Sequence, residues 1–201
     1  MIDSLIPHGT CRHCDEASAD ASPWLCGGCV RSMHRDPGEH AIGELRLRSA
    51  WRYEGALTTL LPWAKNPLVP ELYRWLLEGQ HELPEGAILV PIPTPWRRRF
   101  WRRGCQTTTI AEHLARAGSG RVVHGLRRRR MGIPQASLDA ARRRALPYDT
   151  FVASRPVPGA QIVLVDDVCT TGSTMRAAAA ALAPQLDDGA TLSAFCVARV
   201  P

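Results

Sequence analysis

The chain has 201 residues, of which 45 % are hydrophobic, so it is long enough for one α/β domain with a real core and one small additional element. No apolar run approaches the roughly 20 residues that span a bilayer, and residues 1–7 lack the basic start and long apolar segment of a signal peptide. We therefore expect a cytoplasmic protein without membrane insertion. The formal charge of +6 favours polyanionic partners, and arginines concentrate within 97–103, 127–130 and 142–144.

Four cysteines near the N-terminus form two C-x-x-C pairs, Cys11 with Cys14 and Cys26 with Cys29. Eleven residues separate the pairs, which is enough chain to fold back and close a tetrahedral four-thiolate site of the kind that zinc prefers. Disulfides are disfavoured in a reducing cytoplasm, and four cysteines leave no open coordination position. We predict a structural zinc ion in a zinc-ribbon-like element over 1–40, acting either as a folding staple or as an interaction or nucleic-acid module.

Alternating strands and helices are predicted along the middle of the chain. Apolar and basic residues alternate over 45–53, which indicates a half-exposed strand. Apolar residues at helical spacing predict a helix over 56–64, which Lys65-Asn66-Pro67 ends, and a short second helix over 70–78. The elements that follow are a buried strand at 87–91, a basic and aromatic loop at 96–104, and an amphipathic helix at 106–116.

The C-terminal part of the chain continues this alternation. Its expected elements are a short strand at 121–126, a second short strand beginning at 151, a buried strand at 162–165, a helix from about Met175 to 186, and a strand at 191–197. Strands that alternate with helices in this order predict a parallel sheet with crossover helices. We therefore expect an α/β domain over 41–201.

The run from Ile162 to Thr174 carries the most information about chemistry. Its aliphatic strand ends in two adjacent acids, Asp166 and Asp167, at the sheet edge where open α/β folds bind ligands. Such a pair can accept hydrogen bonds from a diol or hold a divalent cation. The loop that follows, Thr170–Thr174, supplies hydroxyls, backbone N–H groups and the start of a helix, which together favour a phosphate. A polar turn without a ligand is the alternative.

This order of residues resembles the motif with which type I phosphoribosyltransferases bind 5-phosphoribosyl 1-diphosphate (PRPP). The resemblance implies that Asp166 and Asp167 form the catalytic pair and contact the ribose hydroxyls. It also implies a 5-phosphate held by the loop residues Thr170, Thr171, Gly172, Ser173 and Thr174. A magnesium ion and basic side chains would neutralise the pyrophosphate that leaves C1 when a nitrogen nucleophile attacks. The basic candidates are Lys65, Arg102 and Arg103, and a surface position at a helix end is the alternative for Lys65.

Further motifs extend the resemblance over nearly the whole chain. They are the two cysteine pairs, Tyr53-x-Gly55, Val90-Pro91-Ile92-Pro93, and Pro134-Gln135-x-x-Leu138 with Arg142 behind it. With them the chain is similar to the ComF family, amidophosphoribosyltransferase-like proteins with an N-terminal zinc element that are associated with natural competence and DNA uptake in bacteria. Two positions depart from that pattern. Cys105 precedes Gln106 where asparagine is usual, and Ala145-Leu146-Pro147 stands where another asparagine is usual.

We therefore expect a type I phosphoribosyltransferase-like fold that binds PRPP or a related phosphoribosyl ligand, linked to DNA uptake or nucleotide metabolism. The residues leave catalysis and the identity of the acceptor base or amine open. The alternative is a non-catalytic competence factor that holds single-stranded DNA, in which arginines neutralise phosphates and tryptophans stack on bases. A third hypothesis is a scaffold whose zinc element docks on another protein of the competence machinery.

Overall fold

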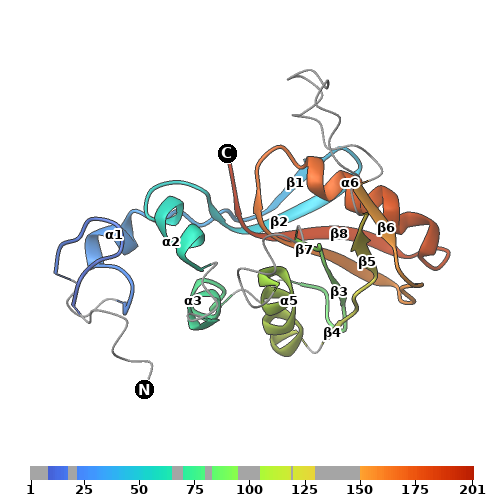
Figure 1. Ribbon diagram of the computed structural model, residues 1–201, viewed down its shortest axis with the longest axis horizontal. Coiled ribbons are helices and arrows are strands. Elements are labelled where there is room, and N and C mark those ends of the chain that lie inside the picture. The colour runs from blue at the N-terminus through green and yellow to red at the C-terminus, as the bar shows by residue number, and fades with distance from the viewer. Residues whose placement is uncertain are drawn as a thin grey trace.

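The computed structural model of the chain describes residues 9–17, 22–64, 70–79, 83–94, 105–118, 120–129 and 150–201. Its main strands are β1 (Glu39–Ile42), β2 (Leu45–Arg52), β3 (Ile88–Pro91), β4 (Arg121–Val122), β7 (Gln161–Cys169) and β8 (Thr191–Arg199). They form one sheet in the order β1-β2-β8-β7-β3-β4 (Figure 1). All neighbours pair parallel except β1 and β2, which form an antiparallel hairpin. The predicted α/β class is confirmed, with a mostly parallel mixed sheet.

The edge strand β1 is not predicted by the sequence. Its four residues alternate between exposed and half-buried positions and include two polar side chains, so they carry no apolar strand signal. The strand forms because Gly43 and Glu44 turn the chain back and bring Ile42 opposite Leu45. Gly43 has a φ of 64°, in the left-handed region that two-residue hairpin turns require. A hairpin therefore stands at the edge of the sheet where one half-exposed strand is expected.

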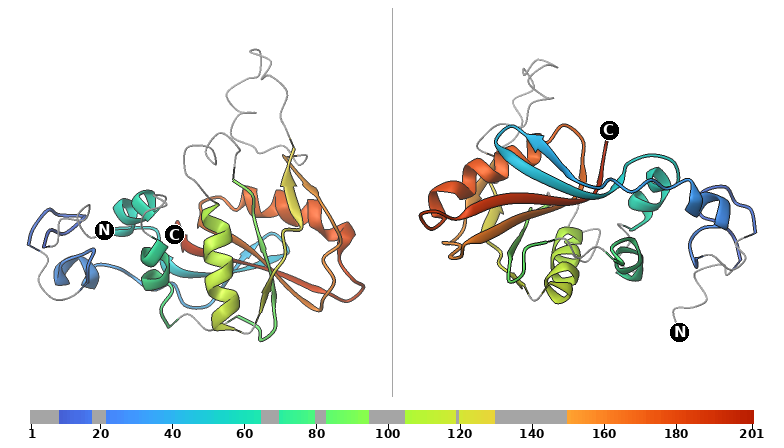
Figure 2. Two further views of the ribbon diagram at one scale, coloured as in Figure 1. Left: turned by 60° about the horizontal axis from the view of Figure 1, so that its bottom comes forward. Right: turned by 180° about the vertical axis from the view of Figure 1, so that it is seen from behind.

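Helices cover both faces of the sheet (Figure 2). They are α2 (Leu57–Ala64), α3 (Pro70–Leu76), α5 (Gln106–Ala117) and α6 (Ser173–Leu182), with a 3₁₀ turn at Ala183–Gln185. Strand β7 divides its side chains between two apolar clusters. Val163 and Val165 share one cluster with α2, α3 and α5, whereas Ile162 and Leu164 share the other with α6. The motif strand is thus buried on both faces, as its aliphatic run predicts.

The helix boundaries lie close to those expected, with one exception. Helix α6 begins at Ser173, before the expected Met175, and it ends at Leu182, where the 3₁₀ turn takes over. Within the described ranges, no helix combines the length and the apolar composition that crossing a bilayer would require.

The prediction of one strand over 121–126 is wrong. The structure has β4 in the main sheet and a separate strand β5 (Leu126–Arg128), which pairs antiparallel with β6 (Phe151–Ala153) in a small second sheet. Gly125 stands between β4 and β5, and a Cβ atom there would overlap the side chain of Val157. The glycine allows the chain to leave the main sheet at a point where no side chain fits.

The N-terminal element lies at one end of the molecule, beside α2 and α3, with the sheet at the other end (Figure 1). Its apolar side chains do not form a separate core. Trp24 and Leu25 are almost fully buried and belong to the same apolar cluster as Leu57 and Leu60 of α2. The cysteine-containing segment is therefore packed directly on the α/β part of the chain.

Candidate functional site

The four cysteines of the N-terminal element converge on one point. Cys26 and Cys29 lie at the start of a short helix, α1 (Gly27–Arg31), and Cys11 and Cys14 approach from the preceding turn. The four sulfur atoms all lie within 4.8 Å of one another, and Sγ of Cys14 is 3.7 Å from Sγ of Cys26. Thiolates at about 2.3 Å from a tetrahedral zinc ion are about 3.8 Å apart. The cluster can therefore hold a structural zinc ion.

The surroundings of the cysteines favour ionisation unequally. Burial raises the pKa of Cys11, but hydrogen bonds from the backbone N–H groups of Cys26, Cys14 and His13 outweigh it and bring that pKa to about 6. Burial, and then the proximity of the other thiols, raises the pKa of Cys29. Four neighbouring thiols do not all ionise at neutral pH without a cation, and a zinc ion supplies the positive charge that allows it.

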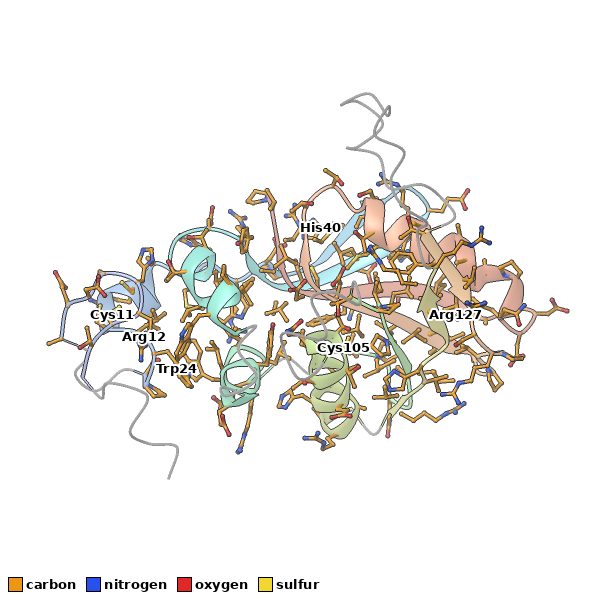
Figure 3. The ribbon with its side chains drawn as sticks, in the orientation of Figure 1. Cys11, Arg12, Trp24, His40, Cys105 and Arg127 are labelled. Atoms are coloured by element: carbon orange, nitrogen blue, oxygen red, sulfur yellow. The ribbon has the colours of Figure 1, made fainter. Side chains whose placement is uncertain are left out.

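Three contacts fix the cysteine element on α2. The rings of Trp24 and Trp63 meet edge to face with centroids 5.2 Å apart, and the guanidinium carbon of Arg12 lies 4.7 Å from the centroid of Trp63. Nδ1 of His13 lies 3.0 Å from Oγ1 of Thr59. Figure 3 labels Arg12 and Trp24 close to Cys11, at the boundary with α2. The four-cysteine cluster is thereby attached to the hydrophobic core and is not carried on a free arm.

The acid pair lies inside β7 and not at its end, which corrects the expectation that the strand ends in acid. The pairing of β7 with β3 stops at Val165, whereas its pairing with β8 continues to Cys169, opposite Arg199. Because β8 continues to supply backbone partners, the strand runs past both acids. Asp166 and Asp167 therefore lie beyond the carboxyl end of β3, in a part of β7 that still pairs with β8.

Backbone donors orient both carboxylates. The N–H of Asp167 donates to Oδ1 of Asp166 at 2.9 Å, and the N–H of Val168 donates to Oδ1 of Asp167 at 2.8 Å. Both acidic side chains are half-buried. Two oriented, adjacent carboxylates are suited to accept hydrogen bonds from a diol or to bind a divalent cation.

The loop after β7 is an ordered turn into α6. Thr170 and Thr171 are exposed, and Gly172 precedes the first helical residue with a φ of 71°. The hydroxyl of Thr171 donates to Oγ of Ser173 at 3.0 Å, and Nη1 of Arg176 donates to the Thr171 carbonyl at 3.0 Å. Hydroxyls thus cluster at the N-terminus of α6, where the helix dipole and the first backbone N–H groups favour an anion.

A residue that the sequence does not single out packs on this turn. Ile42 is the last residue of β1, and a Cβ atom at Gly172 would overlap its Cγ2 atom. A Cβ atom at Gly43 would lie 3.7 Å from Cδ of Arg176. Figures 1 and 2 accordingly show the β1–β2 hairpin beside the start of α6. A glycine in the motif indicates that another part of the chain approaches its backbone closely. The residues around Gly172 do not indicate that this part is Ile42.

The basic residues expected at the pyrophosphate, Lys65, Arg102 and Arg103, lie outside the described residues. Cys105, which departs from the family pattern, is described. Its Sγ atom lies 2.9 Å from Oγ1 of Thr107 and 3.8 Å from Oγ1 of Thr94. Burial raises the pKa of Cys105, but hydrogen bonds that involve these two threonines outweigh it, so the pKa is lowered. The thiol therefore lies between the end of β3 and the start of α5.

Together the fold and the sites define an α/β protein with a mostly parallel mixed sheet, an N-terminal four-cysteine cluster, and an acid pair followed by a hydroxyl-rich turn. No family model matches the chain. Curated relatives do match it, and they bear the name DNA utilization protein YhgH.

The chain is 36 % identical over 126 residues to the Escherichia coli O157:H7 protein of this name, which corresponds to 59 % of this chain and 51 % of that protein. It is 36 % identical over 121 residues to the Salmonella typhimurium protein and 35 % identical over 126 residues to that of Shigella flexneri, with the same two shares. The chain thus spans about half the length of the curated relatives it matches.

Proposed function

We propose that this chain is a ComF-type protein with a phosphoribosyltransferase-like fold, and that it binds PRPP or a related phosphoribosyl ligand at the turn between β7 and α6. One observation carries the proposal. The acid pair lies just beyond the end of β3, and a hydroxyl-rich turn with a left-handed Gly172 follows it at the start of α6. The acid pair can bind the diol of a pentose phosphate, and the adjacent hydroxyl-rich turn can bind its phosphate.

In this assignment the ribose hydroxyls donate to the carboxylates of Asp166 and Asp167. The 5-phosphate accepts hydrogen bonds from the hydroxyls of the turn and from the first backbone N–H groups of α6. The exposed Thr170 and Thr171 and the half-buried Ser173 supply such hydroxyls. The helix dipole adds about 0.3–1 kcal/mol for an anion at this position.

Phosphoribosyl transfer is the reaction that such a site would support. A nitrogen nucleophile attacks C1 of PRPP, the bond from C1 to the pyrophosphate oxygen breaks, and positive charge develops on the ribose ring. The carboxylates of Asp166 and Asp167 would stabilise that charge. A magnesium ion, for which carboxylate oxygens are suitable ligands, would neutralise the pyrophosphate. We propose that basic side chains also help to neutralise the pyrophosphate, namely those of Lys65, Arg102 and Arg103.

Single-stranded DNA binding is the second candidate, because the matched relatives are named for DNA utilization. The described part of the chain offers two exposed arginines for it, Arg127 on β5 and Arg129 just after that strand. Figure 3 places Arg127 at the opposite end of the molecule from Cys11. Arginine contacts to DNA phosphates give an affinity that falls steeply with salt. Binding of PRPP at the β7–α6 turn would depend on magnesium and less on salt.

The test is titration calorimetry with PRPP and magnesium and, separately, with a short single-stranded oligonucleotide, each at low and high salt. Replacing both acids, Asp166→Asn and Asp167→Asn, keeps their shape and removes their charge. We expect PRPP affinity to fall at least about tenfold, or about 1.4 kcal/mol, with an unchanged melting temperature. Asp188→Asn, at an exposed position, is the matched control. Unchanged PRPP affinity in the double variant would reject the ribose assignment, and steep salt dependence of oligonucleotide binding would favour the DNA candidate.

A further inference from the structure

A cavity of about 340 Å³ lies on the face of the sheet that α3 and α5 cover. Its walls come from the segment before β1, from the middle of β2, and from Gly79, Leu83 and Phe195. None of these residues belongs to the acid pair or to the turn after it. Small-molecule sites in proteins begin at about 300 Å³, so this cavity can accommodate a small organic molecule.

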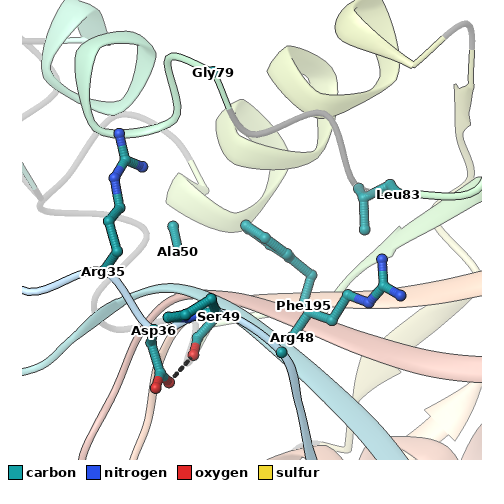
Figure 4. A pocket seen from close by; sticks show the side chains of 10 residues that line it. Arg35, Asp36, Arg48, Ser49, Ala50, Gly79, Leu83 and Phe195 are labelled. Atoms are coloured by element: carbon teal, nitrogen blue, oxygen red, sulfur yellow. Dashed lines mark hydrogen bonds between the residues drawn. The ribbon is translucent and has the colours of Figure 1, made fainter.

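Two arginines flank this cavity (Figure 4). The guanidinium of Arg35 stacks on the ring of Trp51, with its central carbon 3.8 Å from the ring centroid. Arg48 extends from β2, and its Nη2 atom lies 2.9 Å from Oε1 of Glu39. Figure 4 shows the ring of Phe195 between the two arginine side chains. The cavity is thus bounded by cationic groups around an aromatic side chain.

The charge of Arg35 is not balanced by an acid. Across the described ranges, no carboxylate forms an ion pair with it, and its one hydrogen bond, from Nη2 to the Glu78 carbonyl, is long at 3.5 Å. Its stacking on Trp51 leaves the edge of the guanidinium available to an acceptor. A planar guanidinium with an available edge binds carboxylate or phosphate groups through two parallel hydrogen bonds.

Among the described residues that line the cavity, Asp36 is the acid, and neighbouring groups already neutralise its charge. It accepts hydrogen bonds from the hydroxyl of Ser49 and from Nε and Nη2 of Arg199, the latter two at 2.9 and 3.2 Å. In addition, Nε2 of His40 lies 3.1 Å from Oδ2 of Asp36. The described wall of the cavity therefore presents net positive charge, with the apolar side chains of Ala50 and Phe195 at its base.

We propose that this cavity is a binding site for a small organic anion that has a flat apolar part. The phosphate or carboxylate group of the ligand binds the edge of Arg35, and the flat part lies against Ala50 and Phe195. The inference does not depend on PRPP binding, because the two sites share no residue.

Phenyl phosphate is a suitable probe, because it combines a phosphate with a flat ring and lacks the ribose diol that the β7–α6 turn would recognise. Titration calorimetry on the full, zinc-loaded chain compares it with inorganic phosphate and with phenol. We expect phenyl phosphate to bind at least tenfold more tightly than either fragment, and excess ribose 5-phosphate not to displace it. Displacement by ribose 5-phosphate, or equal affinity for phenyl phosphate and inorganic phosphate, overturns the proposal.

Variants test the role of Arg35 directly. Arg35→Gln keeps a hydrogen-bonding side chain but removes the charge, and it should weaken phenyl phosphate binding at least tenfold. Arg74→Gln, which changes an exposed arginine of α3, is the matched control. If Arg35→Gln fails to fold, Leu83→Trp narrows the cavity without changing its charge and should weaken phenyl phosphate more than inorganic phosphate. Wild-type affinity in a folded Arg35→Gln variant, or in Leu83→Trp, overturns the proposal.

Discussion

The cysteine element and the β7–α6 turn are both visible as motifs in the sequence, but they are assembled in different ways. The four clustered cysteines come from one short segment, 11–29, and their sulfur atoms converge within that segment. The turn takes its acids and hydroxyls from 166–174, but its shape depends on Ile42 of β1 and on pairing with β8. The cysteine motif thus specifies its own geometry, whereas the β7–α6 turn specifies its chemistry and depends on distant neighbours for its geometry.

Loss of the zinc site should have the largest effect on stability. It tests how far the cysteine element supports the rest of the fold. Replacing two ligands, Cys11→Ser and Cys26→Ser, should abolish zinc binding and unfold the segment around Trp24. Structural zinc contributes about 10–16 kcal/mol in small zinc-dependent domains. Metal analysis and thermal unfolding measure the effect, and Cys105→Ser, outside the cluster, is the control. A zinc-free variant that melts at the parent temperature would exclude the role of folding staple.

Asp36 follows the cysteine element in the chain and joins that segment to β2 and β8, and its substitution should have the second largest effect. Its side chain is 3 % exposed and binds both Ser49 of β2 and Arg199 of β8. Asp36→Asn leaves the guanidinium of Arg199 without its acid, which we expect to cost about 3 kcal/mol of unfolding free energy. Urea unfolding at neutral pH measures it, with Asp188→Asn as an exposed control. A cost below about 1 kcal/mol would show that this contact does not hold the segment after the cysteine element on β2 and β8.

The effect of Asp36→Asn should also depend on pH. Burial raises the pKa of Asp36, but hydrogen bonds from Arg199 and Ser49 and the nearby positive charges outweigh it, so the pKa is lowered. Because the pKa is lower in the folded state, the ionised carboxylate stabilises the folded protein. This contribution is fully present above the pKa of about 3.9 that an aspartate has in the unfolded chain. That contribution disappears as the pH falls through the folded value. The stability difference between parent and variant should therefore be present at neutral pH and shrink below about pH 4.

Gly172→Ala tests the dependence of the turn on distant neighbours and should have an intermediate effect. The added Cβ atom would overlap Ile42 at a φ of 71°, so we expect a loss of about 2 kcal/mol and weaker ribose 5-phosphate binding. Gly189→Ala is the matched control, since Gly189 has a φ of 78° but nothing within 4 Å of its Cβ position. It should cost about 1 kcal/mol without affecting the ligand.

A second substitution separates strain from overlap in the turn. Ile42→Ala in the Gly172→Ala background should recover the part of the loss that comes from overlap, and denaturant unfolding of the four proteins of this cycle measures it. If Gly172→Ala costs no more than Gly189→Ala, the packing of β1 on the turn has no energetic role.

Arg12→Gln should have the smallest effect. The guanidinium of Arg12 stacks on Trp63 at the boundary between the cysteine element and α2, and such contacts contribute about 0.5–1 kcal/mol. We expect a loss of that size in chemical unfolding, with unchanged zinc content. Arg31→Gln, at an exposed position on α1, should change neither quantity. A loss of zinc in Arg12→Gln would mean that docking on α2 helps to assemble the metal site.

Short-range patterns predict most of the elements. Apolar periodicity places α2, α3 and α5 within two residues of their observed bounds, and the aliphatic run at 162–165 identifies a strand buried on both faces. The errors occur where tertiary contacts override the local signal. Gly125 divides one expected strand into β4 and β5 because of the approach of Val157. Pairing with β8 carries β7 past Asp166 and Asp167, where the acids suggest an end.

The sequence by itself determines the membership of the four-cysteine cluster, the identity of the buried motif strand, and the acidic and hydroxyl chemistry of the turn. Each of these depends on residue types at short separations, where chain geometry leaves little choice. Only the tertiary structure decides that Ile42 packs on Gly172, or that Arg35 faces a cavity with Phe195 at its base. These contacts join residues far apart in the chain, and no local periodicity encodes which distant side chains will meet.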